Sequence, residues 1–197
     1  NKNDIWDAAL GARMSKVGNT TASNTQRKFD TSSAMYFDGS GDEITTPASD
    51  LYNYGTGDFT WEAWVYVSSQ GTYDYIFGQH TLAAGLGLYI QGGVWKLYGG
   101  NAVQITTTTS VSNGTWYHVA LARESGTARL FVDGTLAGNA TITSSIPSGA
   151  TYGITLGRWT EPSDAQYFHG YLQDVRVTNG LARYTSSFTP TTEEFKG

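Results

Sequence analysis

The clearest pattern in the chain is a strict alternation of apolar and polar side chains over residues 59–67, FTWEAWVYV. A period of two indicates a β-strand, because successive side chains of a strand point to opposite faces. The second face is polar but carries Trp64 and Tyr66. We predict that the first face is buried in a core, and its members are Phe59, Trp61, Ala63, Val65 and Val67. On the second face, we expect Thr60, Glu62 and Ser68 to be more exposed.

A second signal is a pair of apolar runs at residues 116–121, WYHVAL, and 130–132, LFV. Turn-forming residues separate the two runs, and Asp133-Gly134 follows the second as a strong hairpin signal. Large side chains on both faces predict central strands that are covered on both sides. A helix is the weaker interpretation, because the runs are short, aromatic and cut by glycine.

Shorter β-favouring runs recur along the rest of the chain, separated by segments rich in glycine, aspartate and proline. They predict further strands over residues 35–37, 43–45, 75–77, 86–90, 94–98, 103–107, 136–140, 153–157 and 168–178. The pattern predicts an all-β domain of two packed antiparallel sheets.

Composition agrees with this fold class and excludes several kinds of partner. Aromatic residues make up 14% and charged residues 15% of the 197 residues, and there are 24 glycines. The net charge is −5 and the 12 basic residues are scattered, so no nucleic-acid surface is expected. No apolar run approaches the ~20 residues that span a bilayer, so no membrane segment is expected, and no signal peptide is found. The chain has no cysteine, which excludes disulfides and thiol chemistry.

Four motifs in order resemble the laminin G-like, or concanavalin A-like, jelly roll. The hairpin carries Trp116, His118, Val119 and Ala120 and ends at Asp133-Gly134, with Tyr117 as a departure from the family pattern. The run FHGYLQDVRV at 168–177 resembles the closing strand of the family. Lys28-Phe29 and the loop at 38–42 match earlier elements. The resemblance covers roughly residues 28–190 and implies a concanavalin A-like jelly-roll sandwich of two antiparallel sheets.

The stretch DVRVTNGLARYT at 174–184 resembles the variant of this domain found in tailed-phage virion proteins of the tail or decoration type. With this resemblance, we predict a single domain over residues 1–197. Residues 1–34 would form an N-terminal edge strand and arm, and residues 190–197 a C-terminal tail. The implied location is a virion surface or the extracellular space.

Catalytic constellations are not expected. Glycoside hydrolysis needs two facing carboxylates, and catalytic relatives of this fold carry an E-x-D-x-E triplet that the sequence lacks. Glu62 stands alone on its strand. The histidines at 80, 118 and 169 have no metal-site spacing, and His118 is expected to be a hydrogen-bonded core residue. A polysaccharide lyase would need a Tyr/His/Arg cluster that sequence spacing does not reveal. Glycosidase and lyase activity therefore stay minor alternatives.

Calcium is a candidate cofactor, because the loop at 38–42, DGSGD, offers carboxylates and exposed carbonyls in a tight turn. The resemblance implies a structural calcium that joins such a loop to a carboxylate in the closing strand. The matching ligands would be Asp38, Asp42 and Asp174. The alternative is that Asp38 only caps a turn and that Asp174 pairs with Arg176 or Arg183.

Aromatic side chains are candidates for stacking against sugar rings. The expected ligand-binding residues are Trp64, Tyr66, Tyr89, Trp95 and Trp159. The alternative is that a loop covers them or that they fill the sandwich. Two functions follow: a non-catalytic, lectin-like adhesion domain for surface polysaccharide, or a structural virion domain whose partners are neighbouring protein subunits.

Overall fold

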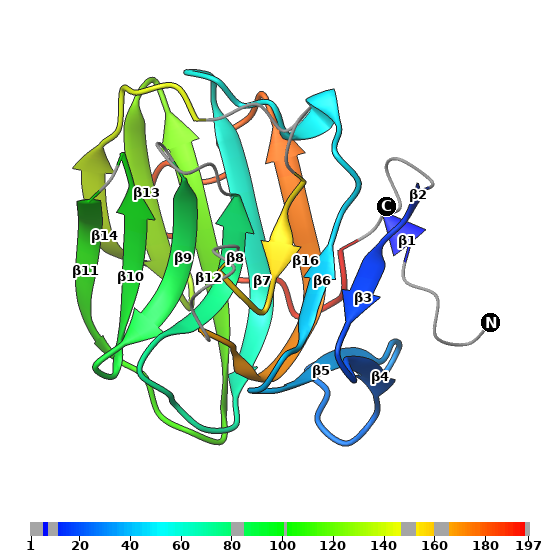
Figure 1. Cartoon of the computed structure of the whole chain (residues 1–197). Coiled ribbons are helices and arrows are strands. Elements are labelled where there is room, and N and C mark those ends of the chain that lie inside the picture. Colours follow the sequence, from blue (N-terminus) through cyan, green and yellow to red (C-terminus); the bar gives the residue numbers. More distant parts are fainter. Residues whose placement is uncertain are drawn as a thin grey trace.

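The computed structural model describes residues 6–7, 12–79, 85–100, 102–146, 153–159 and 166–195, with the backbone alone at 6–7 and 12–13. Two seven-stranded antiparallel sheets pack face to face and enclose a single large apolar core. Figure 1 shows the two layers, one in front of the other. The predicted all-β sandwich is confirmed.

Both sheets combine strands from distant parts of the chain. In spatial order, sheet I runs β11 (Ala102–Ser110), β10 (Val94–Gly99), β9 (Leu86–Gln91), β8 (Asp74–Gln79), β15 (Thr155–Leu156), β6 (Glu43–Thr45) and β3 (Ser15–Val17). Sheet II runs β14 (Thr135–Thr141), β13 (Thr127–Val132), β12 (Thr115–Glu124), β7 (Phe59–Val67), β16 (His169–Asn179), β5 (Ala34–Asp38) and β4 (Thr21–Ser23). A separate pair joins β1 (Trp6–Asp7) to β2 (Ala12–Arg13), and one 3-10 turn, η1, spans Asp50–Tyr52.

The predicted core face of β7 is confirmed, because all five of its alternating apolar side chains are at most 1% exposed. Trp61 stacks on Phe77 of the opposite sheet at a centroid distance of 5.4 Å, and its indole N–H donates to the Tyr54 hydroxyl at 2.9 Å. These contacts join sheet II to sheet I at the centre of the core.

The predicted exposure of the other face of β7 was wrong for two residues. Thr60 and Glu62 are both fully buried, whereas Ser68 is half-buried. The chain after β16 causes this burial, because residues 181–195 cross the outer face of sheet II. We call residues 181–195 the C-terminal segment.

The closing strand β16 contains a bulge that redirects the chain. Its pairing with β7 shifts between Gln173 and Arg176, and Asp174 adopts a left-handed φ of +56° inside the shift. A bulge of this kind bends a strand and re-aims its side chains. No helix among the described residues is long and apolar enough to cross a membrane. His80 and the prolines at 147 and 162 lie outside the described residues.

Candidate functional site

The structure separates the five predicted sugar-stacking residues into three groups. Trp95 lies in the core and is not exposed at all. Tyr89 and Trp159 lie on the outer face of sheet I, and Trp64 and Tyr66 on the outer face of sheet II. Only Tyr66 keeps appreciable exposure, because the other four side chains are all buried. The five residues therefore do not form one binding surface.

The outer face of sheet I carries a compact aromatic cluster. Trp159 lies over two strand glycines, Gly78 and Gly87, and a Cβ at Gly87 would come within 2.6 Å of its ring. Tyr75 stacks on Tyr89 at 4.7 Å and 16°, and Trp159 packs against Tyr75 at 4.8 Å. The flat faces of these three rings pack against each other, so little ring surface is left for a ligand.

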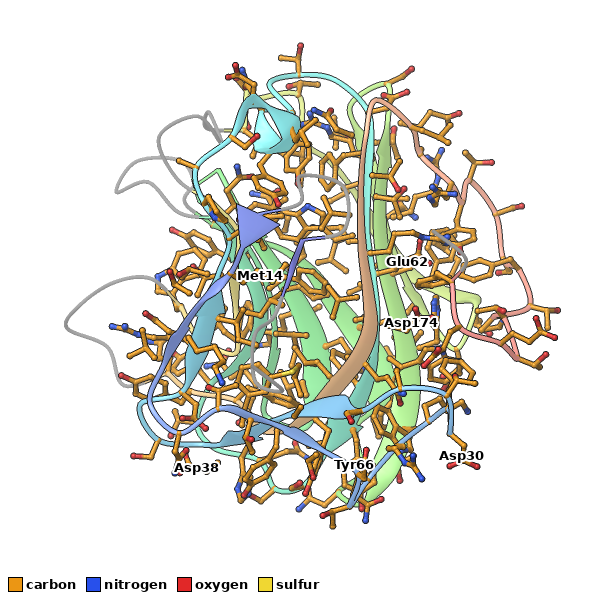
Figure 2. All side chains as sticks on the ribbon, turned by 90° about the vertical axis from the view of Figure 1, so that its right-hand side faces the viewer. Met14, Asp30, Asp38, Glu62, Tyr66 and Asp174 are labelled. Carbon is orange, nitrogen blue, oxygen red and sulfur yellow. The ribbon has the colours of Figure 1, made fainter. Side chains whose placement is uncertain are left out.

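The outer face of sheet II is divided into a covered and an uncovered part. The C-terminal segment covers the half of the face around Glu62, with Tyr184 and Phe188 packing on Phe131 of β13. Figure 2 shows Glu62 and Asp174 facing this segment, whereas Tyr66 lies well below them. The two aromatic residues of β7, Trp64 and Tyr66, thus have different surroundings.

A charged network holds the C-terminal segment in place. The buried Glu62 carboxylate accepts hydrogen bonds from Arg176 Nε at 2.7 Å and from the Tyr184 hydroxyl at 2.8 Å. His118 Nε2 lies 3.4 Å from Glu62 Oε2. The His118 ring is fully buried, and neither ring nitrogen makes a good hydrogen bond, so the expected hydrogen-bonded histidine was only half right.

Burial and neighbouring charges shift the pKa values in this network. Burial alone would raise the pKa of Glu62, but His118, Arg176 and Tyr184 together hold it below its usual value. Burial and the neighbouring Glu62 charge raise the pKa of Tyr184 to about 12. A general base works best with a pKa near the working pH. A Tyr/His/Arg cluster does form around Glu62, with Tyr184 protonated and the carboxylate shielded from solvent.

Trp64 is covered by a different part of the chain. The Gln173 side chain accepts from the backbone N–H of Lys28 at 2.6 Å and donates to the Phe29 carbonyl at 3.0 Å. This clamp sets Phe29 edge-on to the Trp64 ring at 5.9 Å and places Lys28 Nζ 3.9 Å from the ring centroid. For Trp64, the alternative that a loop covers the side chain is therefore the correct one.

The uncovered part of sheet II presents a straight row of four aromatic side chains. Strand register places Trp116 opposite Tyr66, Tyr66 opposite Tyr171, and Tyr171 opposite Tyr36. The successive ring centroids are 5.4, 5.7 and 4.8 Å apart. Trp116, Tyr66 and Tyr36 are half-buried, and Tyr171 between them is 9% exposed. We call these four residues the aromatic row.

Polar groups lie beside the Tyr36 end of the aromatic row. His169 lies beside Tyr36 at 6.3 Å, and its Nδ1 is 2.7 Å from the Ser69 hydroxyl. Burial, the Tyr171 phenol and the Asp38 carboxylate raise the pKa of Tyr36, so its hydroxyl stays protonated. Aromatic faces beside hydroxyl and imidazole groups suit a ligand that has both C–H faces and hydroxyl groups.

Two of the predicted calcium ligands are already used by the chain itself. The fully buried Asp42 accepts from the backbone N–H of Asn19 and of Asp38, both at 2.8 Å. Asp38 accepts from the Asn19 side-chain amide at 3.0 Å and from the Ser40 N–H at 2.8 Å. These bonds hold the loop at 38–42 together and tie it to the turn around Asn19.

Asp174 does not join Asp38 and Asp42. Asp38 pairs with His169, and Asp174 lies further along β16, roughly 16 Å away at ~3.3 Å per residue. Calcium ligands must lie within about 2.4 Å of the ion, so no single ion can bridge these carboxylates. The Asp174 carboxylate instead accepts from the Phe195 N–H at 3.0 Å, and Arg176 pairs with Glu62. No cluster of three or more metal-ligating side chains occurs among the described residues.

Sequence reasoning did not select Trp116, Tyr171 or Tyr36 as site residues. The side chain of each points away from the core, whereas the next residue along the strand, such as Phe37 or Leu172, faces the core. An aromatic residue at an outward-facing position of a strand is a usable signal. It becomes a site only through register between β12, β7, β16 and β5, which are distant in sequence.

Comparison with known proteins gives one family match. The profile described as the concanavalin A-like lectin/glucanases superfamily matches residues 38–183. A search of curated protein sequences gives no significant match.

Solved structures share the fold at low sequence identity. Domain 4 of AbnA, a GH43 extracellular arabinanase from Geobacillus stearothermophilus in complex with arabinotriose, superposes with a TM-score of 0.74 at 18% identity, covering 91% of this chain and 88% of that chain. The receptor-binding domain of botulinum neurotoxin D gives a TM-score of 0.68 at 17% identity, covering 92% and 48%. A mutant sialidase of Trypanosoma rangeli displaying trans-sialidase activity gives 0.67 at 18%, covering 92% and 30%. The chain thus spans less than half of the toxin and sialidase chains.

Proposed function

Because the chain belongs to the concanavalin A-like lectin/glucanases superfamily, we propose that it is a non-catalytic domain that binds carbohydrate through the aromatic row of sheet II. The observation that carries this proposal is the alignment of Trp116, Tyr66, Tyr171 and Tyr36 across four strands on an uncovered part of the sheet. The similar arabinanase domain, solved with arabinotriose, supports the class of ligand.

The absence of catalysis is proposed from the surroundings of Glu62. Its carboxylate is fully buried and bonded to Arg176 and Tyr184, so a substrate has no access to it. The nearby Asp174 carboxylate is bonded to the Phe195 N–H. A glycosidase needs one carboxyl group free to protonate a leaving group and a second free to attack or to activate water, and both of these groups are otherwise engaged.

A glycan array probed with the labelled protein tests the proposal. Wild type should bind a subset of carbohydrates, and the double variant Tyr66→Ala/Trp116→Ala should lose that binding. Truncating a central aromatic contact costs about 2 kcal/mol, which is roughly thirtyfold in affinity. Tyr98→Ala is the matched control, because Tyr98 is a half-buried tyrosine on the opposite sheet. Equal loss in the control, or no glycan bound at all, would refute the proposal.

A protein partner is the second candidate, and one observation favours it. Leu51 and Val175 are 44% and 37% exposed and border a cavity of about 580 Å3 that opens between the sheets. Exposed apolar side chains around a hollow suit a protein contact. In this case Val175→Asp would weaken assembly with a neighbouring subunit and leave glycan binding unchanged.

We further propose an extracellular or virion-surface location. The resemblance of residues 174–184 to tailed-phage virion domains supports the virion, and the extracellular arabinanase supports the space outside the cell. Electron microscopy of virions labelled with an antibody against this domain would test the virion-surface location. Labelling confined to the host cell surface would exclude it.

A further inference from the structure

We infer that the aromatic row binds an interior stretch of a linear, uncharged polysaccharide lying across the strands. This inference rests on the proposed carbohydrate-binding function and adds the class of glycan, its orientation and the part of the chain that is recognised. Three observations carry it: the straightness of the row, its open ends and its charge.

The row is straight because it follows the strand register. Trp116, Tyr66, Tyr171 and Tyr36 are each directly opposite the next, so the line of rings runs perpendicular to the strands. Adjacent strands are about 4.8 Å apart, and the ring centroids repeat at 4.8 to 5.7 Å. Such a repeat presents three half-buried rings, with the less exposed Tyr171 between them, to an extended chain rather than a single pocket to one sugar.

Both ends of the row are open among the described residues. At one end, β13 begins its pairing with β12 at Val119, so β13 does not reach the level of Trp116. The C-terminal segment crosses sheet II away from Trp116, where the Phe188 N–H donates to the Gly134 carbonyl. At the other end, the neighbour of Tyr36 on β4 is the small Thr21. A site for a chain terminus needs a wall that stops the chain, and the residues that the structure describes form none at either end.

The charges near the row favour an uncharged glycan. The Asp38 carboxylate is close enough to raise the pKa of Tyr36. The Lys28 ammonium is placed over the ring of Trp64, which shares a face of β7 with Tyr66. An anionic sugar would meet a like charge at Asp38 and would find no free arginine or lysine in the row itself.

The half-buried phenols and His169 complete the chemistry. The Tyr66 hydroxyl lies near Gly114, since a Cβ there would be 3.8 Å from it, and the Ser69 hydroxyl lies 2.7 Å from His169 Nδ1. Hydroxyl groups therefore flank the rings on the side of the loops. Uncharged sugars offer hydroxyl groups for these partners and C–H faces for the rings.

The test is a titration of wild type with oligosaccharides of increasing length, from monosaccharide to octasaccharide, prepared from linear arabinan, xylan and mannan. Affinity should rise by at least about tenfold from disaccharide to pentasaccharide and then level off, because further units find no ring. Borohydride reduction of the terminal unit should leave the affinity of the octasaccharide unchanged. Polygalacturonate oligomers should bind more weakly than neutral oligomers of the same length.

Variants assign the position of the chain. Tyr66→Ala, near the centre of the row, should weaken binding of every length that binds. Tyr36→Ala, at one end, should spare the disaccharide and weaken the octasaccharide by about tenfold. Tyr98→Ala on sheet I should change nothing.

The outcomes separate this inference from the proposed function. If glycans bind and Tyr66→Ala abolishes binding, but a monosaccharide binds as tightly as an octasaccharide, the proposed function stands and the interior-chain inference fails. The same holds if reduction of the terminus abolishes binding or if anionic oligomers bind better. If no carbohydrate of the series or of the array binds, the proposed function fails and this inference fails with it.

Discussion

The substitution Glu62→Gln tests how the C-terminal segment is held on sheet II. It keeps the size of the side chain and removes its charge. Wild-type Glu62 is fully buried and accepts from Arg176 Nε at 2.7 Å and from the Tyr184 hydroxyl at 2.8 Å. Glutamine can accept one of these bonds, and its amide group then faces the other donor.

The expected loss follows from the exposure of the partners. Breaking a buried ion pair costs about 3–5 kcal/mol when the remaining charge stays buried without a partner or water. Here the Arg176 side chain is 26% exposed and regains some hydration. We therefore expect Glu62→Gln to lower the free energy of unfolding by about 2–3 kcal/mol. Glu124→Gln is the control, because the Glu124 side chain is 43% exposed in its pair with Arg129, and its effect should stay below about 1 kcal/mol.

The pH dependence of this loss has a definite sign. Because the pKa of folded Glu62 lies below its usual value of 4.5, ionised Glu62 stabilises the fold above that pH. This stabilisation disappears as the pH falls through the folded pKa. The difference between wild type and Glu62→Gln should therefore be full at pH 7 and should shrink steadily below pH ~4.5.

Urea denaturation followed by tryptophan fluorescence measures both quantities. The slope with urea should change little, since the folded surface is nearly the same. Equal stability of wild type and variant at pH 7 would refute the reasoning. A difference that stays constant from pH 7 to strongly acidic pH would show that packing, and not charge, causes the loss.

Three further predictions concern the core, the start of β8 in sheet I and the loop at 38–42. Trp61→Ala should cost about 3–5 kcal/mol in urea denaturation, because Trp61 is fully buried and stacked on Phe77, and a smaller loss would contradict this packing. Burial raises the pKa of Asp74 from 3.8 to about 6, so the folded state binds its proton more tightly and loses stability as the pH rises through that range. Asp74→Asn should thus add about 3 kcal/mol at pH 7 and nothing below pH ~4; no gain at pH 7 would count against a buried charge. EDTA should leave the melting temperature unchanged, because chain donors already occupy Asp38 and Asp42; a fall in wild type that Asp38→Ala lacks would restore the calcium site.

The sequence predicted the fold well where one strand carried the whole signal. The alternation at 59–67 matches β7 residue for residue, and the hairpin at 116–134 forms β12 and β13. A period of two needs only neighbouring residues, so local sequence determines it. The same pattern failed for Thr60 and Glu62, because their cover comes from Leu181, Arg183 and Tyr184, more than a hundred residues later.

The candidate site was beyond the reach of the pattern for a related reason. Trp64 and Tyr66 share one face of one strand, yet Lys28 and Phe29 cover the first and leave the second. The row that includes Tyr66 depends on pairing between strands far apart in the chain. The bulge at Asp174, which turns this carboxylate toward Phe195, has no signal in the sequence.

The central claim is that carbohydrate binds on the aromatic row of sheet II, and tryptophan indole signals test it most directly. The protein has six tryptophans, and only Trp116 belongs to the row. In a two-dimensional 15N–1H spectrum, the indole N–H signal of Trp116, assigned with Trp116→Phe, should move as a bound oligosaccharide is added. The signals of Trp95 in the core and of Trp159 on sheet I should stay in place. Movement of Trp159 with Trp116 unchanged would contradict the claim and would place the ligand on the opposite sheet.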